Sequence, residues 1–315
     1  MLHIRVVSPA DTTGRLLDQL SNEAGVVNLV VLRAAALRPG GDAVEFDVLP
    51  GSANAVLAQL RRLELHRDSS VIVEAVDAAI ADPASHPGWR ESYHGERAPV
   101  WELVEARIRA DGTYAPSFFA LLMFAALIGA CGILTNSQIL IVGAMVVGPE
   151  YSAIISVALG LERRDGTPVR RGLLALLAGF LLAIAVTLVF ALCIRASGHT
   201  PKLYLAGVRP VSDLINSPNL FSVVVAVLAG IVGVVSLTLA KAGALIGVFI
   251  SITTIPAAAD IAVSIGYGDW HEAGGSTLQL LLNVGVLVIV GALALRGQRV
   301  IWRGWIQARQ PRPGG

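Results

Sequence analysis

The chain has few charged residues for its length. Only 15% of its 315 residues are Asp, Glu, Lys or Arg, and the mean hydropathy is +0.67. Soluble domains carry about 25% charged residues, so the whole chain is not an ordinary soluble protein. The net charge of +1 gives no sign of the basic surface that binds nucleic acid. We therefore expect no nucleic-acid partner.

Cysteines and catalytic motifs are also scarce. The two cysteines, Cys131 and Cys193, lie inside apolar runs, where packing residues are expected rather than a disulfide or a metal pair. The polar N-terminal part contains no GxxxxGK[ST], no GxGxxG and no metal-spaced His or Cys. Residues 266–269 match the GxGD string of intramembrane aspartyl proteases, but a chain with 32 glycines produces such strings by chance. We expect no enzyme, no cofactor and no metal.

The charged residues are distributed unevenly. Most lie in residues 1–112, whereas residues 116–295 are nearly continuous apolar sequence. Residues 1–15 lack the basic start and apolar core of a signal peptide, so we expect the N-terminal domain to stay in the cytoplasm. The predicted organisation is a soluble domain (1–81), a linker with an interfacial amphipathic helix (82–115), a membrane domain (116–295) and a basic cytoplasmic tail (296–315).

The soluble part alternates strand-like and helix-like patterns. Strands are predicted over residues 2–7, 26–37, 43–49 and 70–75. Asp11 or Thr12 could cap a helix after the first strand, and Ser52 could cap one after the third. The order β-α-β-β-α-β is the α+β ferredoxin-like plan. Such domains sense small ligands or mediate assembly, and the fold alone does not decide between them.

The apolar part contains six runs that can cross a membrane, since a spanning helix needs about 20 residues. The predicted spans are residues 116–135, 138–161, 172–194, 220–240, 243–266 and 276–295. Arginines follow the second span (163, 164, 170 and 171) and the sixth (296, 299, 303 and 309). The positive-inside rule therefore places the N- and C-termini in the cytoplasm. Arg195, Lys202 and Arg209 count against this orientation.

Two spans are interrupted in matching positions. Six spans divide into two sets of three, which predicts an inverted repeat. The second span carries Pro149 and Glu150, and the fifth carries Pro256 and Asp260. A mid-helix proline cannot donate a hydrogen bond and leaves a carbonyl oxygen free. Free backbone groups at membrane depth are tolerated only where protein buries them or a wet cavity receives them.

The two acids, Glu150 and Asp260, need an explanation, because inserting a charged side chain at the bilayer centre costs about 2.5–3.5 kcal/mol or more. One interpretation is structural: Glu150 is protonated and bonded to a neighbouring helix, and Asp260 reaches the outer interface. The other is a polar midplane site for an ion or small solute. Its predicted members are Pro149, Glu150, Tyr151, Ser152, Ser251, Thr253, Thr254, Pro256 and Asp260, joined by Gln279 and Asn283 of the last span.

Five short motifs resemble a known family. They are ILTNS (133–137), IVGAMVVGP (141–149), SPNL (217–220), GALIGV (243–248) and ITTIP (252–256). In order and spacing they resemble the DUF389 membrane proteins of bacteria and archaea, whose function is unknown. The resemblance implies a polytopic protein of the prokaryotic plasma membrane, often with a ferredoxin-like region before the spans. The family commonly has an apolar residue at the position of Glu150 and a double proline at Pro256-Ala257, so a mechanism based on Glu150 would concern a subgroup.

Two functions remain open on this evidence. A transporter or channel explains the paired broken helices and the buried acids. A membrane-anchored sensor or scaffold explains the soluble domain. Small-residue pairs such as Gly243 and Gly247 allow close helix packing within or between subunits, and we expect a homo-oligomer in the lipid bilayer.

Overall fold

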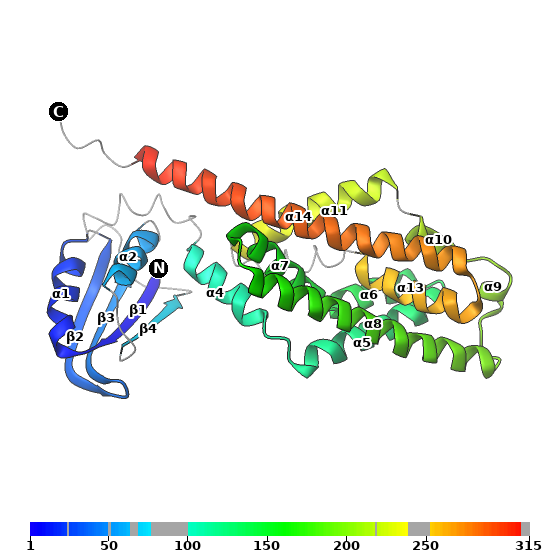
Figure 1. Cartoon of the computed structure of the whole chain (residues 1–315), viewed down its shortest axis with the longest axis horizontal. Helices are drawn as coiled ribbons and strands as arrows, with labels where there is room; N and C mark the ends of the chain where they lie inside the picture. The colour runs from blue at the N-terminus through cyan, green and yellow to red at the C-terminus, as the bar shows by residue number, and fades with distance from the viewer. Residues whose placement is uncertain are drawn as a thin grey trace. The chain divides into compact units, whose positions relative to one another are not determined.

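The structure is a computed structural model that describes residues 1–23, 25–49, 52–63, 69–76, 100–217, 219–238 and 253–309. The chain divides into two compact units, Met1–Glu105 and Ala106–Gly315 (Figure 1). Most of the predicted linker, the first part of the predicted fifth span, Ser251 and the Gly243/Gly247 pair lie outside the described residues.

The first unit is a small antiparallel sheet with helices. Its elements are β1 (Leu2–Ser8), α1 (Ala10–Ser21), β2 (Val26–Leu37), β3 (Gly40–Val48), α2 (Ala53–Arg62) and β4 (Ser70–Ala75). The strand order is β2-β3-β1-β4. All four predicted strands are therefore present, and each neighbouring pair runs antiparallel.

The core of this unit follows from strand alternation. Side chains at every second position point to the same face of a strand, and Ile4 of β1 and Phe46 of β3 are paired partners that are fully buried. Leu16 of α1 and Val56 of α2 belong to the same apolar cluster. The predicted caps were wrong for α1, since Pro9 is its N-cap. Ser52 is the N-cap of α2, but its side chain makes no capping hydrogen bond.

Helix α4 (Trp101–Asp111) lies where the sequence predicts an interfacial helix. Its beginning packs on the sheet unit: Val100 and Leu103 contact the apolar core, and the Trp101 backbone N–H donates to Asn54 Oδ1 at 3.3 Å. Protein packing therefore orders the first turn of this helix.

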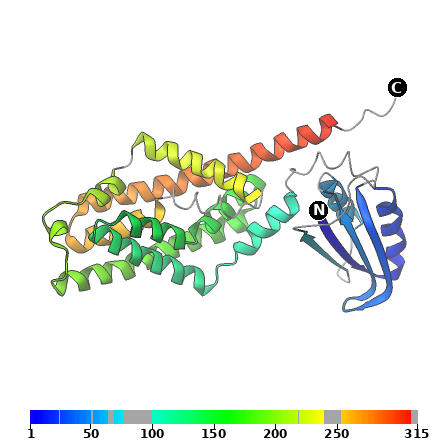
Figure 2. The same cartoon turned by 180° about the vertical axis from the view of Figure 1, so that it is seen from behind.

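The second unit is entirely helical in its described part. Its helices are α5 (Pro116–Leu134), α6 (Gln138–Val147), α7 (Glu150–Arg163), α8 (Gly166–Ala196), α9 (Lys202–Leu205), α10 (Pro210–Asn216), α11 (Leu220–Thr238), α13 (Thr254–Tyr267) and α14 (Trp270–Arg309). Figures 1 and 2 show α11 lying alongside the long α14, and the two helices are in contact.

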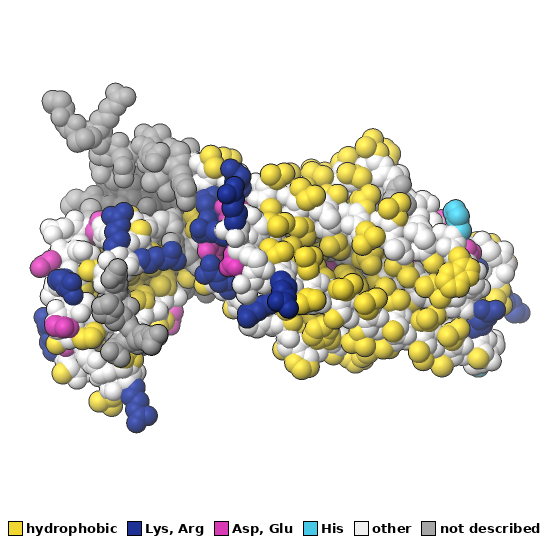
Figure 3. Space-filling view, in the orientation of Figure 1, with side chains coloured by type: hydrophobic (Ala, Val, Ile, Leu, Met, Phe, Trp, Pro, Cys, Tyr) yellow, Lys and Arg dark blue, Asp and Glu magenta, His cyan; other side chains and the backbone are white. Residues whose placement is uncertain are grey.

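Large apolar side chains cover the outside of this unit. Leu177, Val189, Leu281 and Leu293 are each about 60% exposed, and Figure 3 shows apolar side chains over most of the visible face, with Lys and Arg gathered toward its ends. An apolar surface of this extent marks a membrane or protein interface rather than a surface in water. The helical unit is therefore compatible with a multi-pass membrane protein.

The described helices include four or five of the six predicted membrane-crossing helices. Four described helices are long and apolar enough: Pro116–Leu134, Gly166–Ala196, Leu220–Thr238 and Trp270–Ile301. The pair α6 and α7, bent by 51°, would make a fifth. The predicted fifth span begins among residues outside the description, and its described part, α13, is about 21 Å long. That length is less than the roughly 30 Å of a hydrocarbon core.

Small residues let these helices approach closely. A Cβ on Gly129 of α5 would lie 3.0 Å from the Cβ of Ala259 in α13. A Cβ on Gly291 of α14 would lie 3.2 Å from that of Ala158 in α7. Membrane helices use such residues because van der Waals contact, not the hydrophobic effect, holds them together.

Candidate functional site

The chain breaks between α6 and α7 at Gly148 and Pro149. Gly148 is the C-cap of α6 with an extended backbone (ψ 131°), and Pro149 is the N-cap of α7. Proline cannot continue a helix from the preceding turn, so α6 ends and α7 begins at a new angle. The predicted second span is thus two helices rather than one kinked helix, and Glu150 is the first residue of α7.

Pro256 occupies a different position from the one predicted. Thr253 is the N-cap of α13, so Thr254 is its first helical residue and Pro256 its third. The first turn of a helix has no internal acceptors for its N–H groups, and proline fits there without losing a bond. The sequence interpretation of Pro256 as a break inside a helix was therefore wrong.

The N-termini of α7 and α13 meet at Glu150. Thr254 Oγ1 donates to Glu150 Oε1 at 2.8 Å, across 104 residues of sequence. A Cβ on Gly148 would lie 2.7 Å from Ile255 Cδ1 and would also collide with Glu150 Oε2. Glycine is therefore needed at the break, because it lets the carboxylate and the start of α13 approach the backbone.

A second set of polar side chains reaches this point from α14. Asn283 Nδ2 donates to Thr253 Oγ1 at 2.6 Å, and Gln279 Nε2 donates to the same oxygen at 3.3 Å. Asn283 and Gln279 are each 3% exposed. We call Glu150, Thr253, Thr254, Gln279 and Asn283 the helix junction.

The electrostatics of the helix junction suit a buried acid. Glu150 is 4% exposed, and within the described ranges no Lys or Arg pairs with it. Both helix N-termini carry partial positive charge, so α7 and α13 stabilise its carboxylate. Its second oxygen, Oε2, has no hydrogen-bond partner among the described residues, and neither has Gln279 Oε1. Unpaired buried oxygens cost about 1–3 kcal/mol each, which a bound proton or cation would offset.

Three other predicted residues lie near the junction or apart from it. The Tyr151 side chain is buried, and its hydroxyl packs against the backbone of Gly233 in α11. Ser152 Oγ donates to the Pro149 carbonyl oxygen at 2.9 Å and so closes the first turn of α7. Asp260 lies in a separate polar group near the turn between α13 and α14.

Asp260 is completely buried and binds two serines. Ser212 Oγ of α10 donates to its Oδ1, and Ser276 Oγ of α14 donates to its Oδ2, both at 2.6 Å. Ser212 also lies 3.4 Å from Glu272 Oε2. Arg209 Nη1 donates to Glu272 Oε2 at 2.9 Å. We call these five residues the loop network, because they attach the α8–α11 connection to α13 and α14.

The ring of Tyr204 packs against the arginine of the loop network. The Arg209 guanidinium lies 4.2 Å from the ring centroid of Tyr204 and donates to Asp269 Oδ2 at 3.0 Å. Tyr204 is fully buried, and burial raises the pKa of its hydroxyl, while the nearby Arg209 charge opposes that rise. Thr200 Oγ1 and Tyr267 Oη form a further hydrogen bond at 2.6 Å.

Sequence reasoning found the helix junction but missed the loop network. From the sequence, Arg209 is only a cation on the unexpected side, and Glu272 belongs to no predicted site. The sequence does contain a signal for this network. Arg209 and the acidic turn with Asp269 and Glu272 lie on the same predicted side of the membrane, so their opposite charges could have predicted an ion pair.

Comparison with known proteins gives one match. Residues 145–289 match the family described as "Domain of unknown function (DUF389)". No curated protein matches, and no solved structure matches. The matched segment begins just before the α6–α7 break and includes every residue of the helix junction and of the loop network. Through residues 145–289, the chain is thus similar to the DUF389 family.

Proposed function

We propose that the helical unit is a transporter or channel for a small ion or solute, with the helix junction as its binding site. One observation carries the proposal: the Glu150 carboxyl is buried between two helix N-termini, and its Oε2 has no hydrogen-bond partner among the described residues. Ionisable residues inside membrane segments are rare and usually serve ion pathways, proton relays or substrate binding.

The unpaired atoms at the junction indicate which partner fits. Glu150 Oε2 and Gln279 Oε1 are both acceptors without a donor within the described ranges. A group that completes the site must therefore bring a proton or a positive charge. A proton or a small monovalent cation fits better than an anion, because the Glu150 carboxylate already occupies the positive end of both helices.

An inverted repeat agrees with the helix packing. Helix α7 packs against α8 and α14, and α13 packs against the same two helices. Helices α7 and α13 thus each contact the last helix of their own half and of the other half. Transporters built from inverted repeats place their sites where discontinuous helices meet near the bilayer midplane.

The membrane setting is part of the same proposal. We assign the chain to the plasma membrane of a prokaryote, with both termini in the cytoplasm, as a homo-oligomer without enzymatic activity. Arg209 counts less against this orientation than its charge suggests, since it pairs with Asp269 and Glu272. The arginines at 163, 164, 170 and 171 then face the cytoplasm, as the positive-inside rule requires.

The test is ion flux in liposomes that contain the purified full chain. A trapped pH-sensitive dye follows protons, and a potassium-sensitive dye follows a monovalent cation, each under an imposed gradient. Glu150→Gln keeps the shape of the side chain and can still accept from Thr254, but it removes the charge. We expect wild-type flux of at least one of these ions and its abolition in Glu150→Gln.

The matched control is Asp213→Asn, which removes an exposed acid on α10. It should leave flux unchanged. Absence of flux of both ions in wild-type liposomes would overturn the proposal. Equal flux in wild type and Glu150→Gln would show that Glu150 is not part of the transport site. Size-exclusion chromatography of both variants separates lost flux from lost assembly.

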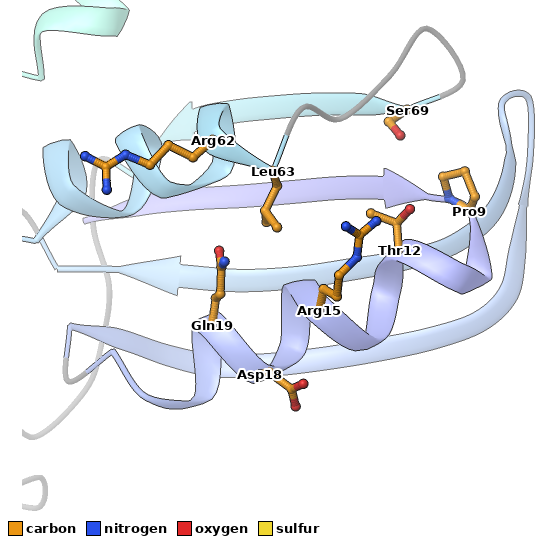
Figure 4. A pocket seen from close by; sticks show the side chains of 8 residues that line it. All are labelled: Pro9, Thr12, Arg15, Asp18, Gln19, Arg62, Leu63 and Ser69. Carbon is orange, nitrogen blue, oxygen red and sulfur yellow. The ribbon is translucent and has the colours of Figure 1, made fainter.

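The second candidate is a membrane-anchored sensor or scaffold. The element order and the strand order β2-β3-β1-β4 support a ferredoxin-like domain. A cavity of about 520 Å³ lies between α1 and α2, lined in part by Thr12, Arg15, Gln19 and Leu63 (Figure 4). This volume suits a small metabolite, but Arg15 and Gln19 are exposed and Figure 4 shows Asp18 directed away.

A ligand screen separates the two candidates. A metabolite that raises the melting temperature of the full chain, but not of Arg15→Gln, supports sensing when flux is absent. Flux that depends on Glu150, without such a ligand, supports transport.

A further inference from the structure

A second cavity lies at the end of the helical unit that carries the α7–α8 connection. Its volume is about 210 Å³. Ligand pockets for whole small molecules measure about 300–1,000 Å³, so this cavity fits a single small group. Its lining comes from the end of α4, the last two turns of α7 and the first two turns of α8.

Three arginines from three helices line this cavity. They are Arg109 of α4, Arg163 at the end of α7 and Arg171 of α8. Asp165 is the one acid in the lining, and its Oδ1 accepts from the Thr167 backbone N–H at 3.0 Å as the N-cap of α8. The lining therefore has a net charge of +2.

The floor of the cavity is built by close packing. Ser156 and Leu159 of α7 are buried and line the same cavity. A Cβ on Gly160 would lie 2.7 Å from Val169 Cγ2 and 3.0 Å from the Asp165 carbonyl oxygen. Glycine at this position lets the start of α8 approach α7, which brings Arg163 and Arg171 to the same cavity.

We propose that the cavity binds a phosphate group, and that this group belongs to an anionic membrane phospholipid. Arginine guanidinium groups bind phosphate through paired, planar hydrogen bonds. Basic pockets between membrane helices on the cytoplasmic side are typical sites for phospholipid headgroups. Arg163 also lies 3.7 Å from Glu162 Oε2, and Arg299 lies 3.5 Å from the same atom, so Glu162 is shared between two cations.

The surface next to the cavity favours a lipid over free phosphate. Leu174, Leu177 and Leu181 of α8 are about half exposed and begin one turn after Arg171. A phosphate held by the arginines would therefore lie where the apolar surface starts, with room for acyl chains along α8. The proposal requires a membrane but does not depend on transport through the helix junction.

The test is lipid binding by the purified full chain in detergent. Native mass spectrometry counts bound phosphatidylglycerol or phosphatidylcholine at matched concentrations, and thermal melting follows the same titrations. We expect binding of phosphatidylglycerol in preference to phosphatidylcholine. Arg171→Gln should weaken the affinity about fivefold, equal to about 1 kcal/mol for one arginine at a membrane surface.

The chain offers a matched control in Arg170→Gln. Arg170 has the same charge and is the neighbour of Arg171 on α8, but it does not line the cavity. Its removal should leave lipid affinity almost unchanged. Arg171→Lys keeps the charge and loses the planar guanidinium, so we expect an intermediate affinity even if Arg171→Gln folds poorly.

Three outcomes would overturn the proposal. Equal affinity for the two lipids would show that no anionic site exists. Equal losses in Arg170→Gln and Arg171→Gln would show general surface charge instead of this cavity. Millimolar inorganic phosphate that stabilises the chain as strongly as phosphatidylglycerol, and displaces it, would overturn the lipid source.

Discussion

The hydrogen bonds of the loop network predict how much stability each of its serines contributes. Ser276→Ala removes the hydroxyl that donates to Asp260 Oδ2 at 2.6 Å and leaves that oxygen without its donor from α14. Both residues are completely buried, so water cannot replace the bond without opening the contact between α13 and α14. Ser212→Ala removes the matching donor from α10.

The expected cost follows from the burial of the oxygen left unpaired. A buried acceptor that loses its donor costs about 1–3 kcal/mol. For a domain of 150–250 residues, 1 kcal/mol lowers the melting temperature by about 2–4 °C. Each serine variant should therefore melt about 2–12 °C below the wild type. Ser212→Ala should fall in the upper part of this range, because Ser212 also contacts Glu272.

The assay is thermal unfolding of the purified full chain in detergent, followed by circular dichroism. Ser217→Ala is the control, since Ser217 is an exposed serine just after α10 whose hydroxyl donates to the neighbouring Asn216. It should change the melting temperature by less than about 2 °C, because exposed substitutions cost within about 0.5 kcal/mol. If Ser212→Ala and Ser217→Ala melted alike, the loop network would not hold α10 to the bundle.

Three further predictions concern other parts of the chain. Gly148→Ala should destabilise the chain by about 1–3 kcal/mol through its clash with α13. Gly143→Ala, whose new Cβ would have no described atom within 4 Å, should not destabilise it, and melting temperatures compare the two variants. Thr254→Val should cost about 1–3 kcal/mol because Glu150 loses its donor, and Thr277→Val, exposed on α14, should cost less than about 0.5 kcal/mol. The backbone N–H of Ala34 and the side chain of Arg33 hold the pKa of Asp42 below its ordinary value. The ionised Asp42 therefore stabilises the fold at pH values above that ordinary pKa, and this stabilisation disappears as the pH falls through the lowered pKa. On acidification, Asp42→Asn should lose less hydrogen-exchange protection in β2 and β3 than the wild type does.

These outcomes are checked against specific alternatives. Equal melting of the two glycine variants would mean that α7 and α13 do not meet as described. No loss in Thr254→Val would mean that its hydroxyl does not support Glu150. For Asp42, exchange that rises equally in wild type and variant on acidification would assign the acid sensitivity to other carboxylates.

The elements that the sequence predicts well are those with a periodic pattern. The strand at residues 2–7 alternates apolar and polar positions, and the strand at 70–75 contains the β-branched run Val71-Ile72-Val73; both form with boundaries shifted by at most one residue. The spans that appear as long apolar runs also form, although α8 extends from Gly166 to Ala196 and α14 continues to Arg309. Apolar runs locate such helices but do not locate their ends, which charged side chains can prolong beyond the membrane.

The helix junction was predicted as a set of residues but not as a geometry. Glu150 and Pro256 attract attention because an acid and a proline are unusual in apolar sequence. Whether a proline starts a helix or breaks one depends on the turn before it, which composition does not show. The contact between Glu150 and Thr254 joins residues 104 positions apart, and only tertiary packing determines it. Ser212 and Ser276, which donate to Asp260, were not predicted either, because only tertiary packing brings them to it.

The most direct test of the central claim asks whether an aqueous reagent reaches the helix junction. In a chain with Cys131 and Cys193 replaced by alanine, Thr253→Cys places a thiol at the start of α13, and Ala257→Cys places one on the same helix where the side chain is fully buried. A membrane-impermeant maleimide is applied to liposomes from each side. The account predicts labelling at position 253 from at least one side and none at 257. Absence of labelling at 253 from both sides, with full labelling after denaturation, would contradict it.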